Sequence, residues 1–241
     1  MNVRTNRMKK ITAATFNIFH CEDFRREKID FDAFAEYISS FEADIIGLNE
    51  VHGKGEHPDY DAQTEILAEK LGYYGYFGKA TEIEGANPFG NAVLTRLPVK
   101  KCVTVPIPDP ETPAYDGYYE TRCVIAMELA DPELTVLVTH FGLNPDEQEN
   151  AVKTVLSVIP NGSCVFMGDL NARPDAPVLA PIKARLKDTA PDEKLYTFPS
   201  NAPYRKIDYI FVSEDIRVNG VKVPDRVLSD HCPFIAELEL L

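Results

Sequence analysis

The chain has 241 residues, of which 44% are hydrophobic and 26% charged, a composition typical of a globular protein with a sizeable core. Its formal net charge is −13 at pH 7. Nonspecific nucleic-acid binders usually present a basic face, because neutralising phosphates dominates their affinity. The charge balance therefore argues against long DNA as the default partner, and we expect no basic stripe on the surface.

Cysteine usage and hydropathy constrain the compartment. The five cysteines are odd in number and none has CxxC spacing, which argues against a disulfide framework and a structural zinc site. The apolar stretch over residues 11–18 is short and interrupted by polar residues, so it makes a poor signal segment. No run approaches the length of a membrane span. We expect a cytoplasmic protein without a membrane span, working as a monomer.

The basic residues 1–10 are predicted to be a flexible N-terminal tail. No linker-like change in composition divides residues 11–241, so we expect them to form one domain. In the first half of the chain, apolar runs predict strands over 9–18, 44–50 and 73–77, the last mostly in the core.

Helical spacing of apolar residues predicts helices over 27–40 and 62–71. Asp61 is the predicted cap of the second helix, and Gly72 closes it. His52 and His57 stand in a polar loop, where histidines are usually solvated.

In the second half, a strand is predicted from Asn91, followed by an irregular, proline-rich loop over 105–119. Its tyrosines could stack on a base or a sugar, but we favour the simpler interpretation that they fix the loop. Further strands are predicted over 122–129, 134–139, 164–171, 207–212, 216–223 and 234–240, and helices over 145–158 and 176–186.

Polar residues recur where the predicted strands end. These positions are Asn17, Glu50, Asn91, His140, Asp169 with Asn171, and Asp230 with His231, while Asp208 lies inside an apolar run and needs a partner. If these ends converge at one sheet edge, they form a single pocket. If the pattern is accidental, the same residues are scattered through an ordinary α/β protein.

The segment Gly168-Asp169-Leu170-Asn171 follows the apolar run of residues 164–167. Asp169 and Asn171 are two residues apart, so in an extended segment they point the same way. A carboxylate and an amide in this arrangement suit the orientation of a water molecule beside a hard cation. Taken alone, the segment fits an Asx-rich turn after a strand equally well.

The sequence resembles the endonuclease/exonuclease/phosphatase superfamily, the group of deoxyribonuclease I. The resemblance covers the chain from residue 11 to its end. It rests on Thr15-Phe16-Asn17-Ile18, Leu48-Asn49-Glu50, Gly90-Asn91, Thr139-His140, Gly168-Asp169-Leu170-Asn171, Ile207-Asp208-Tyr209 and Ser229-Asp230-His231. It implies a four-layer α/β/β/α sandwich, with two face-to-face sheets and helices outside.

The resemblance also implies a metal-dependent phosphoester hydrolase. Glu50 would be the main metal carboxylate, with Asn17 and Asp230 close to the cation. An all-oxygen set of carboxylates and amides suits Mg²⁺ or Mn²⁺. Asp169 and Asn171 would position and polarise the attacking water. The remaining site residues would contact or support the phosphoryl group: His231 paired with Asp208, His140 as a second histidine, and Asn91 as a supporting polar contact.

The implied substrate is a phosphoester, whether a small molecule, a lipid head group or a nucleic acid. We favour a phosphodiesterase or phosphatase over the alternative, an endonuclease or exonuclease on DNA or RNA. A remote alternative is a catalytically inactive binding module, which the presence of Glu50, Asp169 and His231 disfavours. The chain departs from the family at Asn49, where Gln is usual, and we expect little effect. It lacks the Trp-Cys-Asp-Arg signature of the inositol 5-phosphatase branch.

Overall fold

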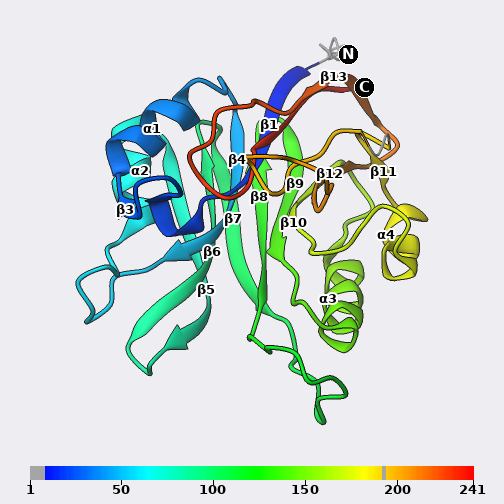
Figure 1. Cartoon of the computed structure of the whole chain (residues 1–241). Helices are drawn as coiled ribbons and strands as arrows, with labels where there is room; N and C mark the ends of the chain where they lie inside the picture. The colour runs from blue at the N-terminus through cyan, green and yellow to red at the C-terminus, as the bar shows by residue number, and fades with distance from the viewer. Residues whose placement is uncertain (1–8, 192–193) are drawn as a thin grey trace.

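The computed structural model describes residues 9–191 and 194–241 (Figure 1). Its first six-stranded sheet has the order β13-β14-β1-β4-β6-β5. In this sheet β1 and β4 are parallel, and α1 (Phe31–Ser39) connects them along the chain; the other pairs are antiparallel. The strands are β1 (Lys9–Asn17), β4 (Ile45–His52), β5 (Tyr74–Ile83), β6 (Asn87–Thr95), β13 (Ile216–Lys222) and β14 (Phe234–Leu240).

The second six-stranded sheet has the order β11-β12-β10-β9-β8-β7. Here the parallel pair is β9 and β10, connected by α3 (Pro145–Val158). The strands are β7 (Val99–Pro106), β8 (Cys123–Ala130), β9 (Glu133–His140), β10 (Cys164–Asp169), β11 (Lys187–Asp188) and β12 (Asp208–Val212). A small hairpin of β2 (Glu22–Asp23) and β3 (Lys28–Ile29) follows the short helix η1 (Phe19–Cys21).

Three apolar clusters separate four layers, which confirms the predicted α/β/β/α sandwich (Figure 1). The central cluster lies between the sheets and includes Ile45, Val138 and Met167. The second packs α1 and α2 (Gln63–Leu71) against the first sheet. The third packs α3, η2 (Pro177–Leu179) and α4 (Ala180–Lys183) against the second sheet.

Burial on both faces explains the continuous apolar runs of the central strands. In β10, Val165 and Met167 face the other sheet, whereas Cys164 and Phe166 face the helices. This alternation follows from the two-residue period of a strand. Each fully buried side chain of this size stabilises the fold by roughly 1.5–3 kcal/mol. The sheet centres are therefore rigid, and their strand ends are held in fixed positions.

The helix predicted over 27–40 is shorter than expected. Its N-terminus is at Asp30, whose side chain accepts a hydrogen bond from the Ala33 amide at 2.9 Å. Lys28 and Ile29 pair instead with β2. The helix predicted over 176–186 is likewise reduced to η2 and α4.

The predicted end of α2 at Gly72 is confirmed, but the predicted N-terminal cap, Asp61, is wrong. Gly72 closes the helix in the left-handed conformation, at φ 69°. Asp61 does not cap it: the N-cap is Ala62, and the Asp61 carboxylate accepts from Lys54 Nζ at 3.0 Å.

The segment 73–77 is a strand but not mostly core. It starts β5 at the edge of the first sheet, where Tyr74 is 65% exposed. The prediction that His52 is solvated is also wrong, because this side chain is buried. The helix over 145–158 is confirmed, with Pro145 in its first turn and a capping box of Asn144 and Glu147.

Side-chain contacts of Tyr119 help to hold the loop between β7 and β8 in place. The Tyr119 hydroxyl donates to Asp146 Oδ2 at 2.9 Å and accepts from the Tyr115 amide at 3.1 Å. The rings of Tyr115 and Tyr118 are 49% and 64% exposed. Only part of the aromatic set therefore fixes the loop.

Two further predictions concern the chain termini and membranes. Lys9 and Lys10 already belong to β1, so the first strand starts inside the predicted tail, while residues 1–8 lie outside the described part of the chain. Within residues 9–191 and 194–241, no helix has the length and apolar character that crossing a bilayer requires.

Candidate active site

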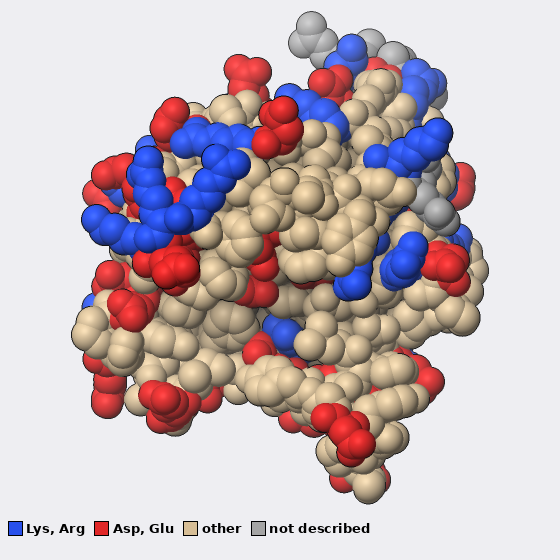
Figure 2. Space-filling model, viewed as in Figure 1, with Lys and Arg blue, Asp and Glu red and all other residues tan. Residues whose placement is uncertain are grey.

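The carboxyl ends of the two parallel strand pairs meet across the sandwich. Asn17 ends β1 and pairs in register with Asn49 of β4, while His140 ends β9 beside Asp169 of β10. The antiparallel strand β12 places Asp208 directly opposite Asp169. Figure 2 shows this face hollowed across its middle, with acidic side chains at the rim and a basic side chain inside.

Asp169 lies at the centre of the polar network. Its Oδ2 accepts from Asn17 Nδ2 at 3.2 Å and lies 3.4 Å from His140 Nε2 and 3.5 Å from His231 Nε2. Its Oδ1 accepts from the Asn171 amide at 2.9 Å. Two imidazoles and one side-chain amide therefore surround Asp169 Oδ2.

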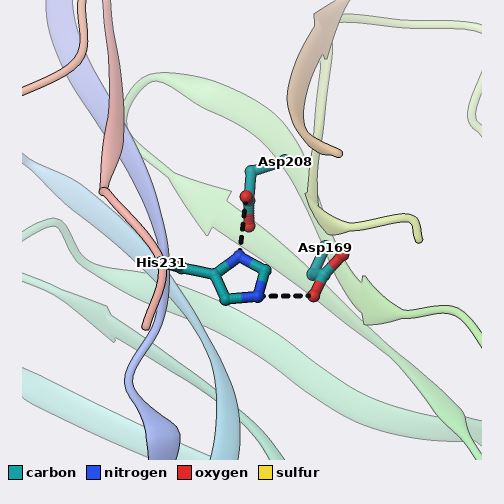
Figure 3. Close-up of side chains that lie close together, drawn as sticks. All are labelled: Asp169, Asp208 and His231. Atoms are coloured by element: carbon teal, nitrogen blue, oxygen red, sulfur yellow. Dashed lines mark hydrogen bonds and ion pairs between the residues drawn. The ribbon is translucent and has the colours of Figure 1, made fainter. Parts of the chain in front are cut away.

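His231 lies between two carboxyl groups (Figure 3). Its Nδ1 donates to Asp208 Oδ2 at 2.9 Å, so the buried Asp208 has the partner that its place in an apolar strand required. Burial alone would lower the pKa of His231, but the carboxylates of Asp208 and Asp169 raise it to about 10. His231 is therefore protonated at neutral pH.

Burial raises the pKa of the Asp169 carboxyl to about 7, against the opposing effect of the His231 imidazolium. A carboxylate with a pKa near neutrality is suited to accept a proton from water.

His140 has the opposite charge state. Arg122 Nη1 lies 2.9 Å from His140 Nδ1, and a guanidinium has only donors, so Nδ1 must be the acceptor. Nε2 then carries the hydrogen and faces Asp169. Burial, the Arg122 charge and the His231 charge all lower the pKa of His140, which is neutral. The site thus combines one charged and one neutral imidazole.

The amide of Asn171 lies beside this pair. Its Nδ2 is 3.1 Å from His140 Nε2 and donates to the Phe141 carbonyl at 3.0 Å. The backbone of Asn171 is left-handed, at φ 46°, a conformation that asparagine tolerates better than most residues.

The predicted metal ligands lie beside Asp169. Asn17 Nδ2 also donates to Glu50 Oε1 at 2.9 Å, which links Glu50 to the network. Ser229 joins Asp230 to the same strand end: its hydroxyl lies 3.1 Å from Asp230 Oδ1 and donates to the Asn17 carbonyl at 2.7 Å. Glu50 has a left-handed backbone, at φ 56°, of the kind that concentrates at functional sites.

The charges of this region fit a divalent cation. Burial raises the pKa of the Asp230 carboxyl, and the nearby Glu50 carboxylate adds to the rise. Two carboxylates that repel each other beside an amide oxygen form a donor set suited to a hard cation. Among the described residues, the closest group of candidate ligands is Asp169, Asp208 and His231, with atoms within 4.8 Å of one another. Asp169 and Asp208 are already partners of His231, whereas Glu50 Oε2 has no such partner in the network described above.

Asn49 is a site residue to which the sequence analysis gave no role. Its side chain is buried between the sheets, donates to Asn91 Oδ1 at 2.8 Å and to the Thr139 carbonyl at 2.9 Å, and accepts from the Asp169 amide at 2.9 Å. Asn91, in turn, donates to the Cys123 carbonyl at 3.2 Å. Asn91 therefore reaches Asp169 only through Asn49, and Asn49 fixes the position of the Asp169 backbone.

The strand ends are thus gathered in one network rather than scattered, which removes the interpretation of accidental motifs. The chain matches the model of the endonuclease/exonuclease/phosphatase family over residues 14–231. It belongs to this family, whose members are generally hydrolytic enzymes acting on phosphoesters and typically depend on divalent metals.

Solved structures support the same fold. An endonuclease/exonuclease/phosphatase from Beutenbergia cavernae is 24% identical, with a TM-score of 0.79 over 96% of this chain and 72% of that chain. One from Bacteroides vulgatus is 21% identical, with a TM-score of 0.76 over 97% of this chain and 100% of that one. A mannosyl-6-phosphatase from Bacteroides thetaiotaomicron is 17% identical, with a TM-score of 0.69 over 95% and 98% of the two chains. Among curated proteins, none matches the sequence.

Proposed function

We propose that the chain hydrolyses phosphoesters with a water molecule activated by Asp169, in the presence of Mg²⁺ or Mn²⁺. The observation that carries this proposal is the continuous chain of contacts from Asp208 through His231 to Asp169, and from Asp169 through Asn17 to Glu50. One branch holds a protonated imidazole beside a carboxylate, and the other ends in the candidate metal ligands.

The protein groups have distinct parts in this reaction. Asp169 takes a proton from the water whose oxygen attacks phosphorus, and the bond from phosphorus to the leaving oxygen breaks. The Nε2 atoms of His231 and His140 lie 3.5 and 3.4 Å from Asp169 Oδ2. These distances are longer than a strong charge-assisted hydrogen bond, so both N–H groups are available to phosphoryl oxygens. Asn171 orients the water beside them.

Glu50, Asn17 and Asp230 would hold the cation. When bound, it would polarise the phosphoryl group and stabilise the leaving oxygen. Phosphoester hydrolysis needs both this electrostatic help and close positioning, because the uncatalysed reaction is extremely slow.

We favour a small phosphoester over a nucleic acid as substrate. The net charge of −13 opposes a long polyanion. Figure 2 shows acidic and basic side chains intermixed above the hollow and mainly acidic ones below it. The likeness to a mannosyl-6-phosphatase supports a small phosphomonoester as one form of this substrate. We further propose a cytoplasmic monomer, which size-exclusion chromatography and cell fractionation would test.

The first test is hydrolysis of p-nitrophenyl phosphate beside bis-p-nitrophenyl phosphate, with Mg²⁺ and with EDTA. Preference for the monoester would indicate a phosphatase. Preference for the diester would indicate a phosphodiesterase and would require assays with DNA and phospholipids. Activity that survives thorough chelation would refute the metal-dependent mechanism. Activity on neither substrate would favour the binding module.

The matched variants are Asp169→Ala and His231→Ala, each expected to lower kcat by roughly 10²–10⁴-fold while the circular dichroism spectrum is unchanged. Glu214→Ala is the control, because this carboxylate is 83% exposed and has no part in the site. Near-normal turnover in either site variant would show that the assigned role is wrong.

A further inference from the structure

A cavity of about 640 Å³ includes His20 and His52 in its lining, and none of its lining residues has a part in the chemistry proposed above. Its walls come from the β2–β3 hairpin, the loop after β4 and the tip of the β5–β6 hairpin, which lie together at the left of Figure 1. Its volume falls in the range of small-molecule sites, which is roughly 300–1,000 Å³.

The cavity and the catalytic site share two strand ends. His20, in the cavity wall, follows Asn17 by three residues, and the intervening Phe19 amide donates to Asn17 Oδ1 at 3.1 Å. His52, also in the wall, follows Glu50 by two residues on β4. A substrate whose phosphoryl group lies at Asn17 and Glu50 would therefore extend its remaining part toward this cavity.

A buried glutamine joins the two strand ends. Gln63 accepts from the His52 amide at 2.9 Å and donates to the His20 carbonyl at 2.6 Å. The wall is thus tied to the same framework that positions the catalytic residues.

Three stacked rings make this wall rigid. The His20 and His52 rings are 4.7 Å apart and nearly parallel, at 3°, and His52 stacks on Tyr60 at 3.8 Å and 10°. His52 Nδ1 lies 3.0 Å from the Asp59 carbonyl and donates to it, which fixes the loop. A preformed wall of this kind lowers the entropy cost of holding a ligand.

The backbone of the wall is held in an unusual conformation. Phe19, His20 and Cys21 are consecutive residues with left-handed φ angles of 44°, 44° and 61°. Side chains with a Cβ rarely adopt this conformation, and such outliers persist at ligand sites where the surrounding contacts hold them.

The lining charges select against a second phosphate. Glu22, Glu27, Asp59 and Glu84 contribute four carboxylates, against the one ammonium group of Lys28. The local field therefore repels the neighbouring phosphates of a nucleic-acid strand. Within the part of the chain that the structure describes, the close group of candidate metal ligands lies elsewhere, at Asp169, Asp208 and His231.

Hydroxyl groups match this lining. Each can donate to a carboxylate and accept from Lys28 or an imidazole, so a polyol satisfies both kinds of group at once. Ile29 and Ile83 add apolar surface suited to the C–H face of a sugar ring. We propose that the cavity binds the neutral, hydroxyl-rich part of the substrate, and that a sugar phosphate is the substrate class. This inference rests on the proposed phosphoester hydrolysis.

The test compares a hexose phosphate, p-nitrophenyl phosphate and a dinucleotide as substrates with Mg²⁺. The wild type is expected to hydrolyse the hexose phosphate with the highest kcat/KM. Glu84→Gln keeps the size of the side chain and removes its charge. It should raise KM for the hexose phosphate about tenfold, which corresponds to one lost hydrogen bond to a charged group, while kcat/KM for p-nitrophenyl phosphate stays within about twofold. Glu214→Gln is the matched control and should change neither.

The outcomes separate the two proposals. A dinucleotide preferred over the hexose phosphate, or an equal effect of Glu84→Gln on both monoesters, would overturn the sugar site and leave phosphoester hydrolysis standing. If p-nitrophenyl phosphate is not hydrolysed either, the proposed activity itself fails. Calorimetric titration of hexose phosphate into the Asp169→Asn protein gives a readout without turnover: binding that Glu84→Gln weakens supports the cavity, and no binding refutes it.

Discussion

His52 makes a testable contribution to the pH dependence of stability. Burial lowers the pKa of its imidazole to about 4, and the bond from Nδ1 to the Asp59 carbonyl opposes this only in part. In the unfolded chain a histidine has a pKa of about 6.5. Between these values the unfolded state binds more protons than the folded one, so stability falls as the pH falls. Integrated from pH 7 to pH 5, the loss is about 2 kcal/mol.

The perturbation is His52→Phe, which keeps an aromatic ring between His20 and Tyr60 and removes the titratable group. At pH 7 the variant loses the hydrogen bond to Asp59, worth about 1 kcal/mol. At pH 5 the variant avoids the cost of protonating a buried imidazole. The difference in unfolding free energy between variant and wild type should therefore change by about 2 kcal/mol, in favour of the variant, between pH 7 and pH 5.

Urea unfolding in EDTA at both pH values measures this, followed by far-ultraviolet circular dichroism because the chain has no tryptophan. Tyr74→Phe is the control: that side chain is 65% exposed on the edge strand β5, and its variant should keep the wild-type pH dependence between pH 5 and pH 7. Parallel pH profiles of wild type and His52→Phe would refute the reasoning.

Three further predictions test contacts within the site. Asn49→Ala leaves the buried Asp169 amide and Thr139 carbonyl without their partner, so unfolding free energy should fall by about 2–4 kcal/mol in a urea titration. Gly168→Ala should destabilise the fold by at least about 3 kcal/mol, because Gly168 has a φ of 148° and its new Cβ would lie 1.8 Å from the Thr139 carbonyl oxygen. Gly162→Ala is the control: its Cβ would meet no atom within 4 Å, so its stability should be unchanged. Arg122→Met frees the ring of His140 and also removes the ion-pair partner of Glu120, so kcat on p-nitrophenyl phosphate should fall about ten- to a hundredfold when it is measured well below the variant's melting temperature. Unchanged kcat would show that Arg122 does not fix the tautomer.

The resemblance to a known family predicted the layers, and the residue pattern predicted where the candidate site would lie. Strands buried on both faces require apolar residues at every position, so β4 and β10 stand out as continuous runs. The polar residue that ends such a run is conspicuous because burying it without a partner is costly. Asn17, Glu50, Asp169 and His231 were singled out in this way, and Asp208 because it interrupts an apolar run; the family motifs then implied a role for each.

Edges and element ends were predicted less well. Tyr74 looks like a core residue in the sequence, yet it lies on an edge strand that only the pairing order of the sheet reveals. Asp61 looks like a helix cap, but its carboxylate meets Lys54 instead. Local patterns carry no information about which neighbour a side chain will reach in the fold.

The contacts that give each site residue its charge and tautomer were decided by the tertiary structure alone. Asn49 and Asp169 are 120 positions apart in the chain and meet because two sheets pack face to face. Arg122 reaches His140 because β8 and β9 are neighbours, and this contact makes one imidazole neutral while Asp208 keeps the other charged. The ring stack of His20, His52 and Tyr60 joins three separate segments in the same way. Sequence patterns report whether a residue is buried, but the partners of a buried polar group depend on how the layers pack.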